Sequence, residues 1–242
     1  MLSGWARHAT LSCHDYLPHR IGMIPAFPRW VWAWAIALPW MAGWVNTVAL
    51  LALHHGGVTH LTGISTEGAI GLATGDLHLL GHAAAILGLF TIGCAISAWI
   101  VRGERWTRTR AAGGMLLGEG VLLSVAATIV DTRPVLGTCL CALAIGFQNG
   151  TSSLVTGAVL RTSHLTGMFT DLGIAIGQAL RGARFDPRRA RICLVVIASF
   201  ISGGIAGALV FQTWSGHALW LAAMLAIVAG VATPSRESLA TS

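Results

Sequence analysis

A short polar motif occurs twice in this chain of 242 residues, and its side chains can carry protons or bind ions. Each copy reads His-Leu-Thr-Gly-x-x-Thr followed by an acidic residue, first over 60–67 and again over 164–171. Histidine changes charge near neutral pH, and carboxylates at membrane depth commonly mark ion or proton pathways. The candidate binding residues in the two copies are His60, Thr62, Gly63, Thr66, Glu67, His164, Thr166, Gly167, Thr170 and Asp171.

A second motif, Gly-aromatic-x-Asn, precedes each copy, at 43–46 and at 146–149. It places amide side chains inside apolar segments, where they can hydrogen-bond a substrate or a broken helix. Asn46, Gln148 and Asn149 are therefore further candidates for the same site.

Carboxylates within apolar segments are costly to leave ionised and unpaired. We expect Glu67 and Asp171, which are equivalent in the two copies, to be protonated, paired with a cation or facing water. The alternative is a structural carboxylate that bonds the backbone or Arg161. Glu119 stands alone in another apolar segment and is a third candidate, with the alternative that it reaches toward the arginines that precede it.

The starts of the two repeated segments favour ligand binding by the backbone. Thr62 and Thr166 are good helix N-cap residues, and Gly63 and Gly167 beside them allow close approach of a ligand. A helix that begins within the membrane presents unpaired N–H groups and the positive end of its dipole. This geometry suits an anion or a carboxylate.

The composition indicates a membrane protein. Hydrophobic residues make up 55% of the chain and charged residues 10%, and the mean hydropathy is +0.71. Soluble domains carry roughly 25% charged residues. The net charge of +6 is carried on the basic side entirely by arginine, which makes nucleic acid a partner to consider.

Apolar segments of roughly 17 to 25 residues can cross a bilayer as helices. Two shorter apolar segments, 62–74 and 166–180, are expected to be re-entrant or broken helices. The sequence thus predicts an all-α membrane protein with one six-span domain over 30–232, between cytoplasmic tails at 1–29 and 233–242. The six predicted spans are 30–53, 83–101, 112–130, 135–159, 192–212 and 215–232.

The arginines orient these spans. With both termini cytoplasmic and neither short segment crossing, every arginine except Arg133 lies on the cytoplasmic side. If only the first short segment crossed, the arginines at 102–110 would move outside. The positive charge is therefore explained by topology, and we expect a lipid bilayer and no nucleic acid as partner.

The repeat extends to a third segment, in which Phe, Gly, a small residue and Ala recur with the same spacing. Three crossings separate the two copies of the polar motif, so the halves, about 30–130 and 135–232, are inverted relative to each other. Inverted repeats are typical of secondary transporters, whose substrate sites lie between broken helices. A duplicated bundle whose repeated residues only pack is the alternative. The matching residues are Phe90, Gly93, Ser97 and Ala98, and Phe200, Gly203, Gly207 and Ala208.

The same residues resemble a known family. The Gly-aromatic-x-polar step ending at Asn46, the Thr-Gly pair after it, and the later Gly-x-Gln-Asn and Thr-Gly-x-x-Thr-Asp-Leu are similar to the YoaK-like multi-pass bacterial membrane proteins. The resemblance covers about 30–232 and implies six spans, a bacterial inner-membrane location and no established activity. The chain departs from it at Asn46 and Ile64, where that family often has Asp and Asn.

The leading prediction is a small secondary transporter or channel, with a central polar site between the repeats and a small molecule or ion as substrate. An intramembrane enzyme is one alternative, although no G-x-S-x-G or H-E-x-x-H motif occurs. A non-transporting sensor or assembly protein is another. No metal or cofactor is expected, because His54, His55 and His60 fit no standard ligand spacing. A homo-oligomer stays open.

Overall fold

The structure is a computed structural model that describes residues 29–53, 57–101, 108–156, 162–182 and 187–232. Over these ranges the chain forms eight α-helices and one 3-10 turn and has no strand, so the predicted all-α class is confirmed there. The predicted tails, apart from Arg29, lie outside the described residues. The helices are α1 (Arg29–Leu53), α2 (Leu61–Thr74), α3 (Leu77–Ile100), α4 (Arg108–Ile129), α5 (Pro134–Thr156), α6 (Leu165–Leu180), α7 (Pro187–Trp214) and α8 (Leu219–Ala232), with the 3-10 turn η1 (Ser215–Ala218) before α8.

Four elements begin or divide elsewhere than predicted. Helix α4 begins at Arg108, before the predicted start at 112. Helix α3 begins at Leu77 because the Asp76 carboxylate caps it, accepting hydrogen bonds from the N–H groups of His78 and Leu79, each at 3.0 Å. Helix α7 begins at Pro187, since proline suits the first turn of a helix. The last predicted span starts as η1 and becomes α-helical only at Leu219.

The expected threonine caps of α2 and α6 are wrong. His60 and His164 occupy the N-cap positions, neither side chain makes a capping hydrogen bond, and the threonines lie inside the first turn. The first helical bonds run from Ile64 N–H to the His60 carbonyl (3.1 Å) and from Met168 N–H to the His164 carbonyl (3.3 Å). The residue before each histidine, Thr59 or Ser163, fixes the path of the chain into the helix. Its N–H group donates a hydrogen bond to an asparagine that is described below.

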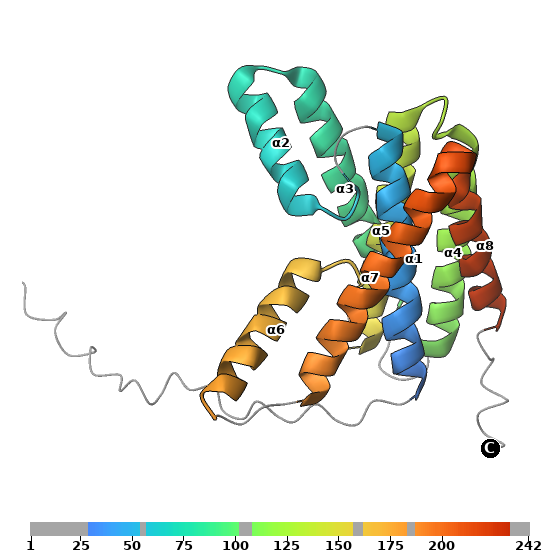
Figure 1. Cartoon of the computed structure of the whole chain (residues 1–242). Coiled ribbons are helices and arrows are strands. Elements are labelled where there is room, and N and C mark those ends of the chain that lie inside the picture. Colours follow the sequence, from blue (N-terminus) through green and yellow to red (C-terminus); the bar gives the residue numbers. More distant parts are fainter. Residues whose placement is uncertain (1–28, 54–56, 102–107, 157–161, 183–186, 233–242) are drawn as a thin grey trace, which may run out of the picture.

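The two halves exchange helices. Helix α1 packs along α7, and α5 packs along α3, so the first helix of each half lies against the third helix of the other. Helix α4 lies between α5 and α8. The short helices α2 and α6 lie on one side of this bundle, against α3 and α7 respectively, with their first turns directed toward each other (Figure 1).

Glycines allow the exchanged helices to approach closely. A Cβ atom on Gly43 would overlap the carbonyl oxygen of Phe200, and one on Gly203 would overlap that of Trp40. Small residues at such crossings let helix backbones touch in a membrane. The α3–α5 pair makes the same contacts at the equivalent positions, with Gly146 against Phe90 and Gly93 against Leu143.

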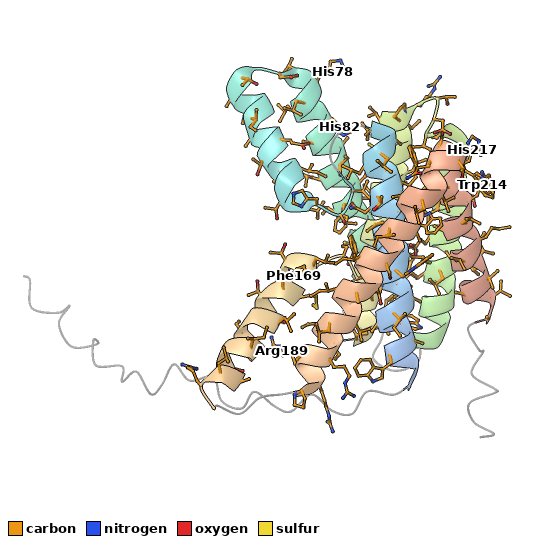
Figure 2. All side chains as sticks on the ribbon, viewed as in Figure 1. His78, His82, Phe169, Arg189, Trp214 and His217 are labelled. Atoms are coloured by element: carbon orange, nitrogen blue, oxygen red, sulfur yellow. The ribbon has the colours of Figure 1, made fainter. Side chains whose placement is uncertain are left out.

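Three stretches among the described residues are long and apolar enough to cross a membrane: Trp32–Leu53, Leu77–Ile100 and Pro187–Ala232. A fourth apolar stretch, Gly113–Ile129, is shorter. Helix α5 is the most buried helix and holds many polar side chains in the interior. Trp214 and His217 lie where α7 passes into α8, at one end of the bundle (Figure 2). The chain therefore has a helical, membrane-like fold.

Candidate functional site

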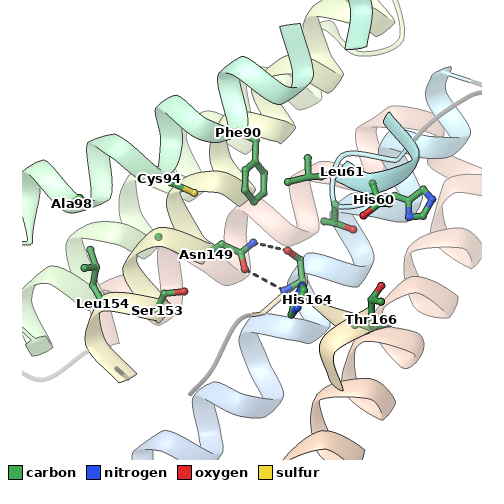
Figure 3. A pocket seen from close by; sticks show the side chains of 15 residues that line it. His60, Leu61, Phe90, Cys94, Ala98, Asn149, Ser153, Leu154, His164 and Thr166 are labelled. Carbon is green, nitrogen blue, oxygen red and sulfur yellow. Dashed lines mark hydrogen bonds between the residues drawn. The ribbon is translucent and has the colours of Figure 1, made fainter. Parts of the chain in front are cut away.

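The first turns of α2 and α6 line one pocket, together with the facing sides of α3 and α5. The pocket has a volume of about 550 Å³ and mixes polar and apolar side chains. Phe90 and Cys94 of α3 contribute to its wall, as does Asn149 of α5 (Figure 3). Five of the candidate residues line it: His60, Thr62, Asn149, His164 and Thr166.

Each histidine at the pocket folds back over the glycine of its own motif. A Cβ atom on Gly63 would overlap the His60 ring, and one on Gly167 would overlap the His164 ring. The glycine of the motif is therefore required by the histidine three residues earlier. The ring positions are fixed in the same way in both copies, and both side chains stay exposed at the pocket.

The asparagine of each Gly-aromatic-x-Asn motif holds the loop that leads into the short helix. Asn46 Oδ1 accepts a hydrogen bond from the N–H of Thr59 at 2.9 Å, and Asn149 Oδ1 accepts one from the N–H of Ser163 at 3.3 Å. Asn149 also donates through Nδ2 to Ser163 Oγ at 2.6 Å. The two motifs thus act together in the structure, since one positions the start of the other.

Glu119 and Gln148 form a buried pair behind the pocket. Both side chains are fully buried, and Gln148 Nε2 donates to the Glu119 carboxylate, 3.0 Å from Oε1 and 3.4 Å from Oε2. Gln148 Oε1 accepts from the hydroxyl of Thr162 at 2.9 Å. Glu119 is therefore directed into the bundle, against α5, and the side chains of the arginines at the start of α4 lie outside the described residues.

Thr66 and Thr170 lie one turn beyond the pocket and do not line it. Each hydroxyl donates to the carbonyl of the motif's first threonine, from Thr66 to Thr62 at 3.0 Å and from Thr170 to Thr166 at 2.9 Å. These hydroxyls satisfy their hydrogen bonding within their own helices.

The repeated carboxylates lie outside the pocket and have different surroundings. Glu67 lines a second cavity, of about 760 Å³, between α2 and the start of α3, and interacts electrostatically with His82. Asp171 accepts a hydrogen bond from Arg189 of α7 at 2.9 Å and forms an ion pair with it. Arg161, the partner considered for these carboxylates, lies outside the described residues.

Sequence reasoning missed several residues of this region. Thr59 and Thr162–Ser163 carried a usable signal, because a polar residue directly precedes the histidine in both copies. Phe90 and Cys94 carried no polar signal and reach the pocket through the packing of α3 on α5. Within the described ranges, no three His, Cys, Asp or Glu side chains gather closely enough to hold a metal ion.

The chain belongs to the family DUF1275, whose members are described as proteins of unknown function. The family model matches residues 34–232, which include all eight helices except the first five residues of α1. No curated protein and no solved structure matches the chain. The family assignment therefore leaves the activity to be argued from the site.

Proposed function

We propose that the protein is a small secondary transporter or channel whose substrate binds in the pocket between α2 and α6. The observation that carries the proposal is that two half-length helices, one from each copy of the motif, begin at the same pocket. With 14 and 16 residues they extend about 21 and 24 Å, less than the roughly 30 Å of a bilayer core. Helices that end within a membrane are typical of transporter binding sites.

The pocket suits a small polar molecule or an ion. Its volume of about 550 Å³ is within the range of roughly 300–1,000 Å³ found for small-molecule sites. Neither helix start has a side-chain cap, so the N–H groups of both first turns are available to a ligand. Similar groups from the two halves meet there, which favours transport over an enzyme reaction, where unlike groups at fixed positions are needed.

The proposal includes six spans, with α2 and α6 ending inside the membrane and both chain termini in the cytoplasm. An inverted relation of the halves is supported by the exchange of α1 and α5 between them, since equivalent glycines make equivalent contacts in the two crossings. A bacterial inner-membrane location follows from the YoaK-like resemblance, with which the DUF1275 match is consistent.

The repeated carboxylates lie outside the pocket, and we propose that they also take part in transport. Glu67 interacts electrostatically with His82 of α3, and Asp171 pairs with Arg189 of α7, so both interactions can change with the position of α2 or α6. We expect Glu67→Gln and Asp171→Asn to reach the membrane and to lose solute flux. Normal flux in both variants would remove the carboxylates from the mechanism.

Cys94 gives a direct test of the pocket, because its side chain lines the wall while Cys139, Cys141 and Cys193 are buried. Labelling of Cys94 would be measured separately from that of Cys13, which lies outside the described residues. The full chain would be reconstituted in liposomes and treated with a membrane-impermeant thiol reagent from either side. Flux would be measured with a panel of amino acids, small carboxylates and inorganic ions. We expect the reagent to label Cys94 and to block flux of at least one solute.

The matched control is Cys94→Ala, which should transport that solute and should not be blocked by the reagent. A pocket that is dry and closed predicts no labelling of Cys94 from either side. That result, together with flux no greater than in protein-free liposomes for the whole panel, would contradict the transporter proposal.

A further inference from the structure

The buried carboxyl group of Glu119 has no charged partner within the described part of the chain. It is fully buried in α4, and Gln148 is the hydrogen-bonding partner that contacts it. An ionised carboxylate in such a place is strongly disfavoured unless a proton or a cation neutralises it. Glu119 is therefore expected to bind a proton or a cation during at least part of a transport cycle.

A continuous set of hydrogen bonds connects this carboxyl group to the pocket wall. Gln148 contacts Glu119 on one side and Thr162 on the other. The Thr162 hydroxyl lies 2.9 Å from Gln148 Oε1 and 3.1 Å from Asn149 Oδ1. Because a hydroxyl has one hydrogen, it can donate to only one of these oxygens at a time.

The first half of the protein lacks this connection. Val45 occupies the position equivalent to Gln148, and Val58 occupies the position equivalent to Thr162. Both valines are fully buried. Apolar residues can therefore fill these positions in the fold. Gln148 and Thr162 in the second half need an explanation other than packing.

The groups that surround Glu119 are otherwise neutral or distant. Helix α8 has no titratable residue, and helix α5 has only Cys139 and Cys141. On η1, His217 is paired with Asp131 at 2.8 Å, at the end of the bundle. No described charge on these packed elements therefore compensates Glu119.

We propose that Glu119 is the proton-binding residue of the transport cycle, and that Gln148 and Thr162 pass its protonation state to the pocket wall. The inference rests on the proposed transport function and names its coupling ion. The network has two consistent arrangements. In the one that the structure has, Gln148 Nε2 donates to the carboxylate and Thr162 donates to Gln148 Oε1.

When a proton binds, the new carboxyl O–H donates to Gln148 Oε1 after the amide turns over. Gln148 Nε2 then donates to Thr162 Oγ1, and the Thr162 hydrogen turns to Asn149 Oδ1. That oxygen also accepts from the N–H of Ser163, so the loop before α6 is held differently in the two states. The proton stays on Glu119, and only the directions of the other hydrogen bonds change.

Infrared difference spectroscopy tests the proton itself without a known substrate. The full chain in phosphatidylcholine vesicles would be stepped through pH, and the C=O band of a protonated carboxyl group followed. We expect a band that titrates in the wild type and is lost in Glu119→Gln. The matched control is Glu67→Gln, the same substitution at another glutamate, and it should keep the band. A pH difference spectrum that is the same in Glu119→Gln as in the wild type would overturn the assignment.

Hydrogen exchange tests the connection to the pocket, with the first half as an internal control. After correction for the chemical exchange rate, protection of 162–168 should change across the pH range of the infrared band, whereas 58–64 should not change. The change should be lost in Glu119→Gln and in Thr162→Val, which copies the first half. A change that persists in Thr162→Val, or that occurs equally in both loops, contradicts the connection.

Other outcomes separate this inference from the transporter proposal. If Na⁺ at constant pH alters the 162–168 loop and no titrating band is lost in Glu119→Gln, the carboxylate binds a metal cation and the proton inference is wrong. If Glu119→Gln transports a solute with an unchanged pH dependence, the inference fails while the transporter proposal stands. If the carboxyl band of Glu119 titrates but no solute is transported, the transporter proposal is contradicted and the proton binding is not.

Discussion

Gly43 of α1 and Phe200 of α7 are in backbone contact, so that a methyl group on the glycine would overlap the phenylalanine carbonyl oxygen. Gly146 and Phe90 have the same relationship in α5 and α3. Hydrophobic burial gives little preference between a helix partner and lipid inside a membrane. Close packing at these two crossings is therefore a principal stabilising interaction of the bundle.

We predict that Gly43→Ala destabilises the protein by about 1–3 kcal/mol, because one added methyl group overfills a tight crossing. Thermal unfolding in detergent micelles measures the effect. The matched control is Gly88→Ala in α3, where no atom lies within 4 Å of an added Cβ. Alanine there should be neutral or stabilising through helix propensity. Equal melting temperatures for the two variants would show that the Gly43 crossing is not tight.

The histidine–glycine contact at the start of α6 gives a second prediction. Gly167→Ala should displace the His164 ring and change the rate at which an impermeant thiol reagent labels Cys94. The double variant Gly167→Ala/His164→Ala should return the rate toward that of His164→Ala alone, because the methyl group then meets no ring. Gly173→Ala, at an open position of the same helix, is the control. Labelling at the wild-type rate in Gly167→Ala would contradict the contact.

The asparagine that holds each loop gives a third prediction. Asn46→Ala removes the acceptor for the Thr59 N–H, and an unsatisfied group of this kind costs roughly 1–3 kcal/mol. Hydrogen exchange should become faster over 57–63, and over 162–166 for Asn149→Ala. Gln178→Ala, an amide on α6 away from both loops, should change neither. Unchanged exchange in both asparagine variants would mean that the loops are held by other contacts.

The ion pair between α6 and α7 gives a fourth prediction. Both side chains are partly exposed, at 28% for Asp171 and 46% for Arg189, so the pair should contribute less than about 1 kcal/mol to stability. Asp171→Arg should lower the melting temperature through repulsion with Arg189. The exchange Asp171→Arg/Arg189→Asp should restore most of the loss. A double variant as unstable as the single one would show that the pair does not form.

Much of the helical pattern could be predicted, because long apolar segments separated by arginines and short polar loops determine it. The start of α3 could not, since Leu77–Ile100 begins with a polar-flanked turn that is helical only because Asp76 caps it. The pairing of α1 with α7 depends on residues such as Gly43 and Phe200, which are far apart in the sequence. The repeat predicted that such positions are equivalent but not which helix each would meet.

The candidate site could be predicted in part, because the repeat marks its residues but not the contacts that they make. His60 and His164 were found because the repeat marked them, and the structure brings both to one pocket. Their role as N-cap residues depends on the hydrogen bonds of Asn46 and Asn149 to the preceding loops, which no local pattern indicates. The burial of Glu119 against Gln148 likewise follows from the packing of α4 on α5.

The exchange of helices between the halves has a consequence for biosynthesis. Helix α1 leaves the ribosome first, yet its main partner α7 is made only after more than half of the chain has followed. Neither half can complete its own packing, because α1 lacks its main partner until α7 has been made, although α3, α4 and α5 can already pack on one another. A gene fragment encoding one half would therefore yield no folded product by itself, whereas both halves produced together in one cell should assemble.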